Sequence, residues 1–499
     1  MPPKSPRVAI PETAALLALA CVLYGLLMTD PIVGLADHGD YFRIMNKVGL
    51  KWLTDDRDER YYWYVNRLFG HAEPARETYF SSENYIAWIA VGLDNVFTGD
   101  EYFSITAIGA VHAALFLLGV GLILFALRGL PLPLRIALAA MMVFMYGDVG
   151  YVAWFNSLYS EPASQIFLFI ALGLALFLSG DVSTRRRWLL GAAYYVAAFL
   201  FLTAKPQNGP CGVVMAALGF WLTLNPDKSR RKFIWNAAAA LPGIVMVVLS
   251  GWLTLVGQPA YMKQANIYDA IFVDLLKYSP SAEADMKELG IDDPRFKNLI
   301  GYDFYTVQDP LVKTPEFEQG FYDRIGYGKI LAFYARHPDR FYGMIDRIAR
   351  WSYTARPLSM GNYEHAAAPV TNWPEGHPPV PQLSTSFSAW SRLKDAVFPK
   401  AGWFLIGFFL LNLAFPVAWF ARGKNRRMRG YALVHLSITL MAGLQFFASA
   451  IGQGESSIVK HLYLFDILFD GLVMILALHL VRGAREGLRL LRRRGFESA

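Results

Sequence analysis

Apolar residues gather in ten long stretches, and each stretch is close to the length of a membrane-spanning helix. Such a helix needs about 20 mostly apolar residues, because the hydrocarbon core of a bilayer is about 30 Å thick. The pattern therefore predicts an all-α polytopic membrane protein with about ten transmembrane helices. The predicted spans are residues 10–28, 103–127, 134–154, 161–179, 188–204, 209–225, 233–256, 402–421, 431–451 and 462–481.

Basic residues concentrate in the short loops that fall on one side of these spans. Loops 180–187, 226–232 and 422–430 are rich in Arg and Lys, the tail after Val481 is basic, and loop 128–133 is the weakest of the set. Short basic loops face the cytoplasm in membrane proteins. Ten crossings return the chain to its starting side, so both termini are predicted to be cytoplasmic.

The first apolar run follows Lys4 and Arg7, which is also the pattern of a cleaved signal peptide. No clear small-residue cleavage site follows it directly, and the charge pattern of the loops is satisfied best when this run is kept. We therefore interpret it as the first transmembrane helix.

Two long polar segments fall on the side opposite the basic loops. Segment 29–102 contains a weaker apolar stretch, Tyr85 to Phe97, which we interpret as an amphipathic helix lying at the membrane interface. Segment 257–401 is long enough for a small, mostly helical domain, and Lys329 to Tyr353 has apolar residues at helical spacing. The predicted organisation is helices one to seven with a first outer loop in 1–256, an extracytoplasmic domain in 257–401, and helices eight to ten with a basic tail in 402–499.

Composition agrees with a membrane protein. Charged residues make up 17% of the 499 positions and mean hydropathy is +0.30, whereas soluble domains carry about 25% charged residues. The net charge of +7 lies in short runs beside apolar stretches, such as Arg185–Arg187 and Arg492–Arg494, which indicates contact with anionic lipid and not with nucleic acid. The two cysteines, Cys21 and Cys211, lie in or near apolar stretches, so a disulfide or a zinc cluster is not expected.

Two carboxylates and an arginine stand directly after the first span, in the sequence Asp37-His38-Gly39-Asp40-Tyr41-Phe42-Arg43. At this depth, where membrane meets water, a carboxylate can act as general base toward an acceptor hydroxyl. Arg43 can bind a phosphate or hold a carboxylate in place. The alternative is structural: Asp40 caps a short helix from Tyr41 to Val48, and Asp37 belongs to an ordinary turn.

A second candidate is the tight turn between the third and fourth spans, Phe155-Asn156-Ser157-Leu158-Tyr159-Ser160-Glu161-Pro162. Asn156, Tyr159 and Glu161 are candidates for contact with substrate, and an acidic group at the membrane edge favours a functional role. The structural alternative is that Ser160 and Glu161 simply begin the fourth helix.

Cations on the outer side need an explanation, because positive charge is expected mainly in the cytoplasm. A lipid-linked phosphate or pyrophosphate would account for them, and pairing with nearby acids or snorkelling is the alternative. The candidates are Lys205, Arg350, Arg356, Lys460 and His461. No nucleotide-binding loop and no zinc-ligand spacing occurs in the sequence.

The order of these parts resembles the GT-C superfamily of membrane glycosyltransferases. The segments Asp37–Arg43, Phe155–Glu161 and Phe333-Tyr334-Ala335-Arg336-His337-Pro338 are similar to bacterial glycan-biosynthesis hexose transferases of that type. The resemblance implies a polyprenyl-phosphate sugar donor, a glycan or lipid-linked acceptor, and inversion at the anomeric carbon. It further implies a location in the bacterial plasma membrane and an active site on the outer face.

The resemblance also implies roles for particular residues. Asp37 or Asp40 would be the catalytic carboxylate, and the phosphate-binding cations would come from the five candidates above. Some members use a divalent cation, Mg²⁺ or Mn²⁺, and Asp37, Asp40 and Glu161 are the acids available to hold one.

Two other functions remain open. A polymerase or ligase that joins whole glycans shares this topology, but it would be expected to use outer-loop arginines more than an early acidic pair. A transporter or flippase should carry ionisable residues near helix centres. Here His112, Asp466 and Asp470 are the main exceptions to uncharged helix centres.

The predicted topology can be tested by labelling. A cysteine introduced within 257–401, in a chain without Cys21 and Cys211, should react with a membrane-impermeant maleimide added from outside the cell. Reaction from the cytoplasmic side alone would overturn both the helix count and the proposed location of the site.

Overall fold

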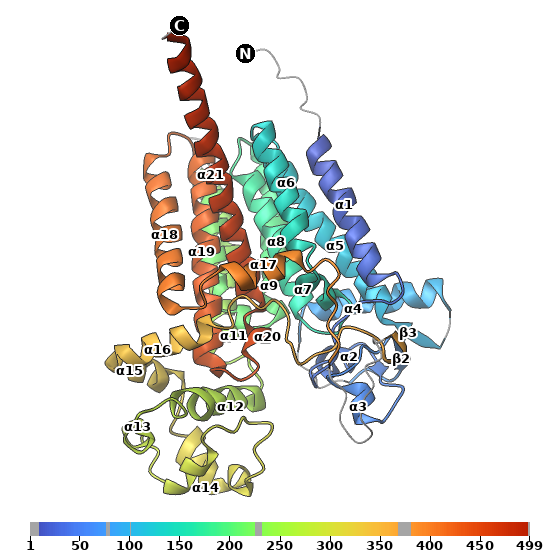
Figure 1. Cartoon of the computed structure of the whole chain (residues 1–499), viewed down its shortest axis with the longest axis vertical. Coiled ribbons are helices and arrows are strands. Elements are labelled where there is room, and N and C mark those ends of the chain that lie inside the picture. The colour runs from blue at the N-terminus through green and yellow to red at the C-terminus, as the bar shows by residue number, and fades with distance from the viewer. Residues whose placement is uncertain (1–8, 76–79, 100, 225–231, 368–380, 498–499) are drawn as a thin grey trace.

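Long, roughly parallel helices form the body of the protein in the computed structural model, which describes residues 9–75, 80–99, 101–224, 232–367 and 381–497 (Figure 1). Most of the described residues are helical, as predicted. The bundle helices are α1 (Ile10–Leu27), α5 (Ile105–Ala126), α6 (Leu132–Tyr146), α8 (Glu161–Leu178), α9 (Thr184–Ala204), α10 (Cys211–Thr223), α11 (Lys232–Leu255), α18 (Gly402–Arg422), α19 (Arg426–Gln453) and α21 (Tyr463–Glu497).

Each of the ten predicted spans overlaps one of these helices. Among the described residues, eight helices are long and apolar enough to cross a membrane, judged by length and composition. The predicted span 134–154 is instead a bent pair: α6 and the stretch Val149–Phe155 meet at 56°. The bend begins at Gly147 and Asp148, where the Asp148 carboxylate accepts the Gly150 N–H at 2.8 Å and starts α7 (Val149–Val152). The predicted span 209–225 is represented by α10, which has only 13 residues.

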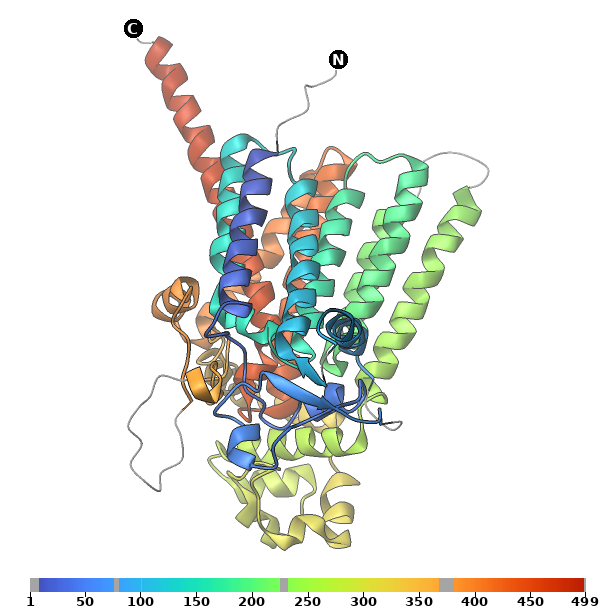
Figure 2. The ribbon, with the colours of Figure 1, turned by 90° about the vertical axis from the view of Figure 1, so that its right-hand side faces the viewer.

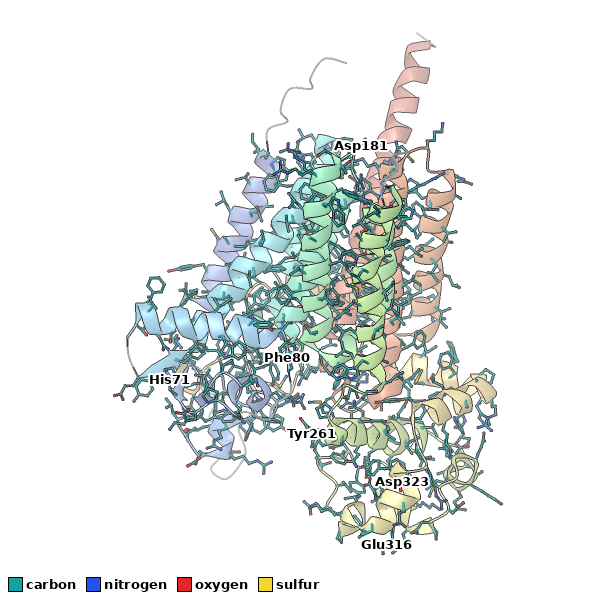
Figure 3. All side chains as sticks on the ribbon, turned by 180° about the vertical axis from the view of Figure 1, so that it is seen from behind. His71, Phe80, Asp181, Tyr261, Glu316 and Asp323 are labelled. Carbon is teal, nitrogen blue, oxygen red and sulfur yellow. The ribbon has the colours of Figure 1, made fainter. Side chains whose placement is uncertain are left out.

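The two ends of the bundle differ in what they carry. α1 begins and α21 ends at one end, which we call the basic end (Figure 1). Asp181, in the predicted basic loop 180–187, lies at this end, whereas His71, Phe80, Tyr261 and Asp323 lie at the other (Figure 3). We call that other end the loop end, because segments 29–102 and 257–401 gather there. Two parts of the predicted basic regions lie outside the described part of the chain. They are residues 226–231 of loop 226–232 and the side chains of Arg492–Arg494.

α4 (Glu83–Phe97) is the predicted amphipathic helix, and it lies across the bundle direction at the loop end (Figures 2 and 3). Its first residue, Glu83, is fully buried, with one carboxylate oxygen 2.7 Å from His112 Nε2 on α5 and the other accepting the Ala163 N–H of α8 at 3.0 Å. His112 Nδ1 lies 2.8 Å from the Phe155 carbonyl oxygen, so Nδ1 must carry a hydrogen. The 2.7 Å contact between His112 Nε2 and the Glu83 carboxyl joins α4 to α5.

A small antiparallel sheet, which the sequence did not predict, lies beside α4 in the first outer segment. It has the order β1 (Leu50–Lys51), β2 (Leu68–His71) and β3 (Tyr102–Ser104), with Phe69 paired to Phe103. The sheet returns the chain from segment 29–102 to the start of α5. It thereby holds the residues that follow α1 close to the bundle.

The second outer segment is mostly helical, as predicted. Its main helices are α12 (Ala260–Asp269), α13 (Ala282–Leu289), α14 (Pro315–Phe317), α15 (Tyr327–Arg336), α16 (Pro338–Ala349) and α17 (Ala389–Val397). The predicted helical stretch Lys329 to Tyr353 is broken at Pro338, which lacks the N–H that a continuous helix would need and stands at the start of α16.

The backbone at Gly361, in the second outer segment, lies between two stretches of the first outer segment. The Gly361 N–H donates to the Tyr62 carbonyl at 2.7 Å, and the Ala36 N–H donates to the Gly361 carbonyl at 2.9 Å. A side chain at Gly361 would come within 1.8 Å of the Trp63 carbonyl oxygen, so this crossing requires glycine. The two outer segments are therefore held together by backbone hydrogen bonds next to Asp37.

The buried Glu83–His112 pair should control the stability of the loop end. Replacing Glu83 by Leu leaves a buried polar imidazole without its partner, so we expect the free energy of unfolding to fall by about 3 kcal/mol. The double variant Glu83→Leu/His112→Phe removes both polar groups and should recover most of that loss. Thermal unfolding in detergent measures both, with Glu283→Ala at the exposed Glu283–Lys297 pair as the control. Equal stability of all four proteins would contradict the role of this pair.

Candidate active site

Asp37 organises the turn that follows α1. Its Oδ1 accepts the backbone N–H groups of Gly39 and Asp40 at 2.8 Å and that of Tyr41 at 3.0 Å. Gly39 adopts φ +101, a left-handed conformation that glycine takes without strain. The cap considered for Asp40 is therefore not formed: Asp37 holds the turn, and the short helix α2 (Phe42–Met45) follows it without a side-chain cap. The turn directs the Asp40 side chain away from Asp37.

The second oxygen of Asp37 has no partner. Oδ2 is buried and makes no hydrogen bond among the described residues. Burial raises the pKa of Asp37 to about 6, against the lowering effect of the three N–H donors. Asp37 is thus a buried structural carboxylate that does not line the cavity described below.

Asp40 is held between two cations, one three residues along the chain and one 420 residues away. Its Oδ1 lies 2.7 Å from Arg43 Nη2, and its Oδ2 pairs with Nζ of Lys460 on the short helix α20 (Ile458–His461). Burial opposes ionisation of Asp40, but the charges of Lys460 and Arg43 outweigh it and hold the pKa of this carboxyl below its usual range. Asp40 is therefore a carboxylate at neutral pH.

His38 lies beside this ion pair and carries no charge. Burial, and then the charge of Lys460, lowers the pKa of His38 to about 3, so the ring is uncharged at neutral pH. Lys460 Nζ donates to His38 Nε2 at 3.1 Å and lies 4.6 Å from the centre of the Tyr159 ring. The Tyr159 hydroxyl donates to the Ala36 carbonyl at 3.0 Å and accepts the His38 backbone N–H at 2.9 Å. These contacts fix Lys460 opposite Asp40.

A second ion pair stands beside the first. Glu161 begins α8, and its carboxylate lies 2.8 Å from Nζ of Lys205, which follows α9. Both ion pairs face one small cavity with about 260 Å³ of empty volume, including its open mouth. Three cations and two carboxylates leave this cavity one net positive charge. Its lining residues, among those described, are Asp40, Arg43, Ile44, Leu158, Tyr159, Ser160, Glu161, Lys205 and Lys460.

Six of the eleven predicted site residues thus line one cavity, and five do not: Asp37, described above, and four others. The Asn156 amide donates to the Leu27 and Val33 carbonyls at 2.9 Å each and fastens the end of α1. Arg356 is bound to Asn362 and to the Ser384 carbonyl. Arg350 is exposed and lies 3.4 Å from Asp346, and His461 Nδ1 lies 3.4 Å from Gln207 Oε1. In this structure these four side chains make local contacts outside the cavity.

The sequence analysis did not single out His38 or Lys394. His38 lies inside the quoted motif between the two acids, and that position was its only signal. Lys394 of α17 is fully buried and lies 3.1 Å from Asp466 and 3.4 Å from Asp470, the two acids of α21 that suggested a transporter. Trp390 Nε1 also donates to Asp470 at 2.7 Å. This cluster fastens α17 to α21 and gives the two acids a structural explanation.

The donor set does not fit a divalent cation. Within the described ranges no three His, Cys, Asp or Glu side chains gather as a metal site requires. Both Asp40 oxygens and Oε1 of Glu161 already face cations. We therefore derive no step that involves a metal.

The comparisons with known proteins identify a family. The family described as the YfdI N-terminal transmembrane domain matches residues 4–494. The chain belongs to this family. Together with the apolar helices, this match makes the protein an integral membrane protein. No curated protein matches the chain.

One solved structure is similar in arrangement. It is an oligosaccharyltransferase from Archaeoglobus fulgidus in the apo form, with 10% sequence identity and a TM-score of 0.37 over 96% of this chain. The chain spans about half the length of that protein, 52% of it. A likeness of this strength supports no inference about activity.

The structural role of Asp37 can be tested by comparing the stability of two variants. Asp37→Asn keeps an oxygen that can accept the three N–H groups, whereas Asp37→Ala leaves them without an acceptor, which should lower the free energy of unfolding by about 1–3 kcal/mol. The two free energies of unfolding, measured in detergent, test this.

The pH dependence of the free energy of unfolding is a second test of the Asp37 carboxyl group. The folded protein holds a proton on Asp37 up to a pKa of about 6, and the usual value is 3.8. The contribution of the protonated Asp37 carboxyl to the free energy of unfolding is therefore complete below about pH 4, and it is lost as the pH rises through about 6. In Asp37→Asn this loss of stability should be absent. If the parent and Asp37→Asn showed the same dependence of unfolding free energy on pH, the raised pKa of a buried Asp37 would be contradicted.

Proposed function

We propose that this protein is an inverting glycosyltransferase that moves a sugar from a polyprenyl-phosphate donor to a glycan or lipid-linked acceptor. The observation that carries the proposal is the cavity at the loop end in which Asp40 is held by Lys460 and Arg43. It combines a carboxylate fit for proton transfer with cations fit for a phosphate, and both classes of group are what sugar transfer from a phosphate requires.

The cations bind the donor phosphate. A phosphate that enters the cavity competes with Asp40 for Lys460 and Arg43, and Lys205 adds a third cation beside them. The net positive charge of the cavity favours an anionic ligand. Lys460 is only 4% exposed, so an anion that reaches it is largely removed from water and interacts with it strongly.

Phosphate binding also prepares Asp40 as the base. The low pKa of Asp40 depends on the charges of Lys460 and Arg43. When the phosphate neutralises those charges, burial dominates and raises the pKa of the carboxyl. Asp40 then becomes a better proton acceptor at the moment when the donor is in place.

The transfer is a single displacement. The acceptor hydroxyl oxygen attacks the anomeric carbon of the donor sugar, and its proton passes to the Asp40 carboxylate. The bond between the anomeric carbon and the phosphate oxygen breaks, and the electron pair leaves with polyprenyl phosphate, whose added charge Lys460, Arg43 and Lys205 stabilise. Attack on the face opposite the leaving group inverts the anomeric configuration.

The position of the cavity suits a lipid-linked donor. Its residues come from the loop ends of α8 and α9 and from the segments next to α1 and α21, where spanning helices give way to the polar segments. A polyprenyl chain can therefore remain among lipids while its phosphate reaches the cations. We place this site on the outer face of a bacterial plasma membrane, with both termini in the cytoplasm and segment 257–401 selecting the acceptor.

The alternatives receive less support. A ligase was expected to use outer-loop arginines more than an early acidic pair, and of the three candidate arginines only Arg43 lines the cavity, where it pairs with Asp40. The transporter reading relied on Asp466 and Asp470, which are engaged by Lys394.

Two substitutions test the proposal directly. Asp40→Asn removes the base and Lys460→Gln removes the principal phosphate contact, so each should lower the sugar-transfer rate by about 100-fold or more. The measurement is transfer of radiolabelled sugar from polyprenyl phosphate to membrane glycan. Each variant breaks the Asp40–Lys460 ion pair, and Lys460 is nearly enclosed by protein, so both should unfold at a lower temperature than the parent. Transfer is therefore measured well below the unfolding temperature of each variant.

The matched control is the exposed pair Asp395–Lys400, with its atoms 2.6 Å apart. Asp395→Asn and Lys400→Gln remove the same charges at the loop end outside the cavity and should retain full activity. Full transfer by folded Asp40→Asn, or a loss of transfer in the control variants, would overturn the proposed base.

A further inference from the structure

A second and larger cavity lies inside the helix bundle. It has about 1150 Å³ of empty volume, including its opening, and residues of α5, α6, α8, α19 and α21 line it. We call it the bundle cavity. Two of its helices, α6 and α21, run side by side along the bundle (Figure 1). Among the described residues it shares no lining residue with the cavity of Asp40, so the two cavities are separate sites.

The depth of the bundle cavity is close to that of one bilayer leaflet. α6 begins at Leu132, at the basic end, and the lining follows this helix from Leu134 to Tyr146. These positions are separated by about 18 Å along the helix axis. One leaflet of the hydrocarbon core is about 15 Å thick, half of the core. The cavity therefore reaches from the basic end about as deep as the acyl chains of one leaflet.

The wall of the bundle cavity suits hydrocarbon better than water. Most of its lining side chains are Leu, Ile, Val, Met or Phe. The Tyr146 hydroxyl donates to the Ile467 carbonyl at 2.9 Å, and His435 Nε2 lies 3.0 Å from Asn412 Oδ1. His435 Nδ1 is then one buried acceptor without a partner among the described residues. A buried water needs about two to four polar partners, so this wall does not hold a column of waters.

Gly471 of α21 keeps part of this space open. A Cβ at this position would meet the Tyr146 hydroxyl at 3.4 Å and Ile438 Cγ2 at 4.0 Å, which are ordinary contact distances. Helix packing therefore does not require a glycine here, and a larger side chain would occupy the cavity. Protein interiors leave few voids larger than a water molecule, so an apolar space of this size indicates an occupant.

Positive charge stands at the basic end of the bundle cavity. Exposed Arg482 of α21 lines it there. Exposed Arg427 of α19 lies beside Tyr431, another lining residue: its Nε donates to the Tyr431 hydroxyl at 2.9 Å, and its guanidinium lies 5.6 Å from the centre of that ring. Arginine forms paired hydrogen bonds with phosphate oxygens, and basic pockets between transmembrane helices suit anionic lipid head groups. The occupant is thus apolar along its length and anionic at one end.

We propose that the bundle cavity binds an anionic phospholipid, with one acyl chain against its apolar wall and the phosphate at Arg482 and Arg427. The lipid then fills the space between α6 and α21 and stabilises their packing. A polyprenyl-phosphate donor is the competing occupant. A donor bound at Asp40 carries its phosphate at the loop end, whereas the arginines of the bundle cavity stand at the basic end. This inference does not depend on the proposed sugar transfer.

Lipid titration tests the charged end of the site. The full chain in detergent is titrated with phosphatidylglycerol or with phosphatidylcholine of the same acyl chains, and bound lipid is measured by native mass spectrometry. The parent should bind one phosphatidylglycerol and prefer it to phosphatidylcholine. Arg482→Gln should weaken phosphatidylglycerol binding about fivefold. Arg422→Gln, at an exposed arginine that ends α18 outside the cavity, is the matched control and should bind as the parent does. Equal affinity of the parent for the two lipids, or no effect of Arg482→Gln, would refute the site.

Filling the bundle cavity tests the apolar part. Gly471→Phe from α21 and Leu138→Phe from α6 each place a ring in the cavity and should abolish the binding of phosphatidylglycerol. Gly407→Phe makes the same change on the exposed side of α18, where a Cβ meets no atom within 4 Å, and should leave binding intact. Thermal unfolding in phospholipid-free detergent identifies the folded variants. Added phosphatidylglycerol should raise the unfolding temperature of the parent and Gly407→Phe but not that of the filled variants.

Two results would overturn the assignment. Binding of phosphatidylglycerol by a folded filled variant as tightly as by the parent would place the lipid elsewhere. Displacement of the bound phosphatidylglycerol by polyprenyl phosphate, in the parent but not in the filled variants, would assign the cavity to the donor chain instead.

Discussion

The ion pair between Asp40 and Lys460 is the contact on which the loop end depends. Lys460 is nearly enclosed by protein, and an ammonium group in that position requires a carboxylate partner, because an unpaired buried charge costs several kcal/mol. The partner comes from 420 positions earlier in the sequence. The pair therefore joins the segment after α1 to the segment before α21, and the bundle between them must bring these two ends together.

The surroundings of this pair hold it rigidly, and Glu161 is a second carboxylate whose charge acts on Lys460. Asp37 fixes the turn through three backbone N–H groups, and neutral His38 and the Tyr159 ring contact the ammonium group. Glu161 is engaged by Lys205. In the proposed function, the donor phosphate competes with Asp40 for Lys460 and Arg43, and Asp40, which stays in the cavity, gains proton affinity as the phosphate takes over its cations. That exchange links donor binding to the proton affinity of Asp40.

The sequence predicts the fold well because its main signal is simple. Apolar length and the position of basic loops depend on the bilayer, and neither requires knowledge of packing. The sheet β1–β3 was not predicted, since its strands have two to four residues and carry no distinct pattern. The bend after α6 depends on a local cap at Asp148 within an apolar stretch, and apolar length alone does not reveal it.

The site was predicted only in part, for a physical reason. The motif from Asp37 to Arg43 was recognisable, but the sequence could not say which carboxylate faces the cavity. That depends on the turn in which Asp37 accepts three backbone N–H groups. Asn156 and Arg356 looked like substrate contacts, whereas in the structure their partners include backbone carbonyls, which leave no trace in a sequence. Lys460 and Lys205 were named as candidate phosphate ligands, with pairing to nearby acids as the alternative. Only the fold reveals that they meet Asp40 and Glu161.

Direct measurement of donor binding tests the central claim, that Lys460 exchanges Asp40 for the phosphate of a lipid-linked sugar. Native mass spectrometry of the purified protein with a polyprenyl-phosphate hexose would give affinities for the parent chain, Lys460→Gln and Lys400→Gln. The account predicts that Lys460→Gln weakens binding at least about tenfold, that Lys400→Gln has no effect, and that the uncharged polyprenol binds the three proteins equally. Equal affinity of the parent and Lys460→Gln for the phosphorylated donor would contradict it.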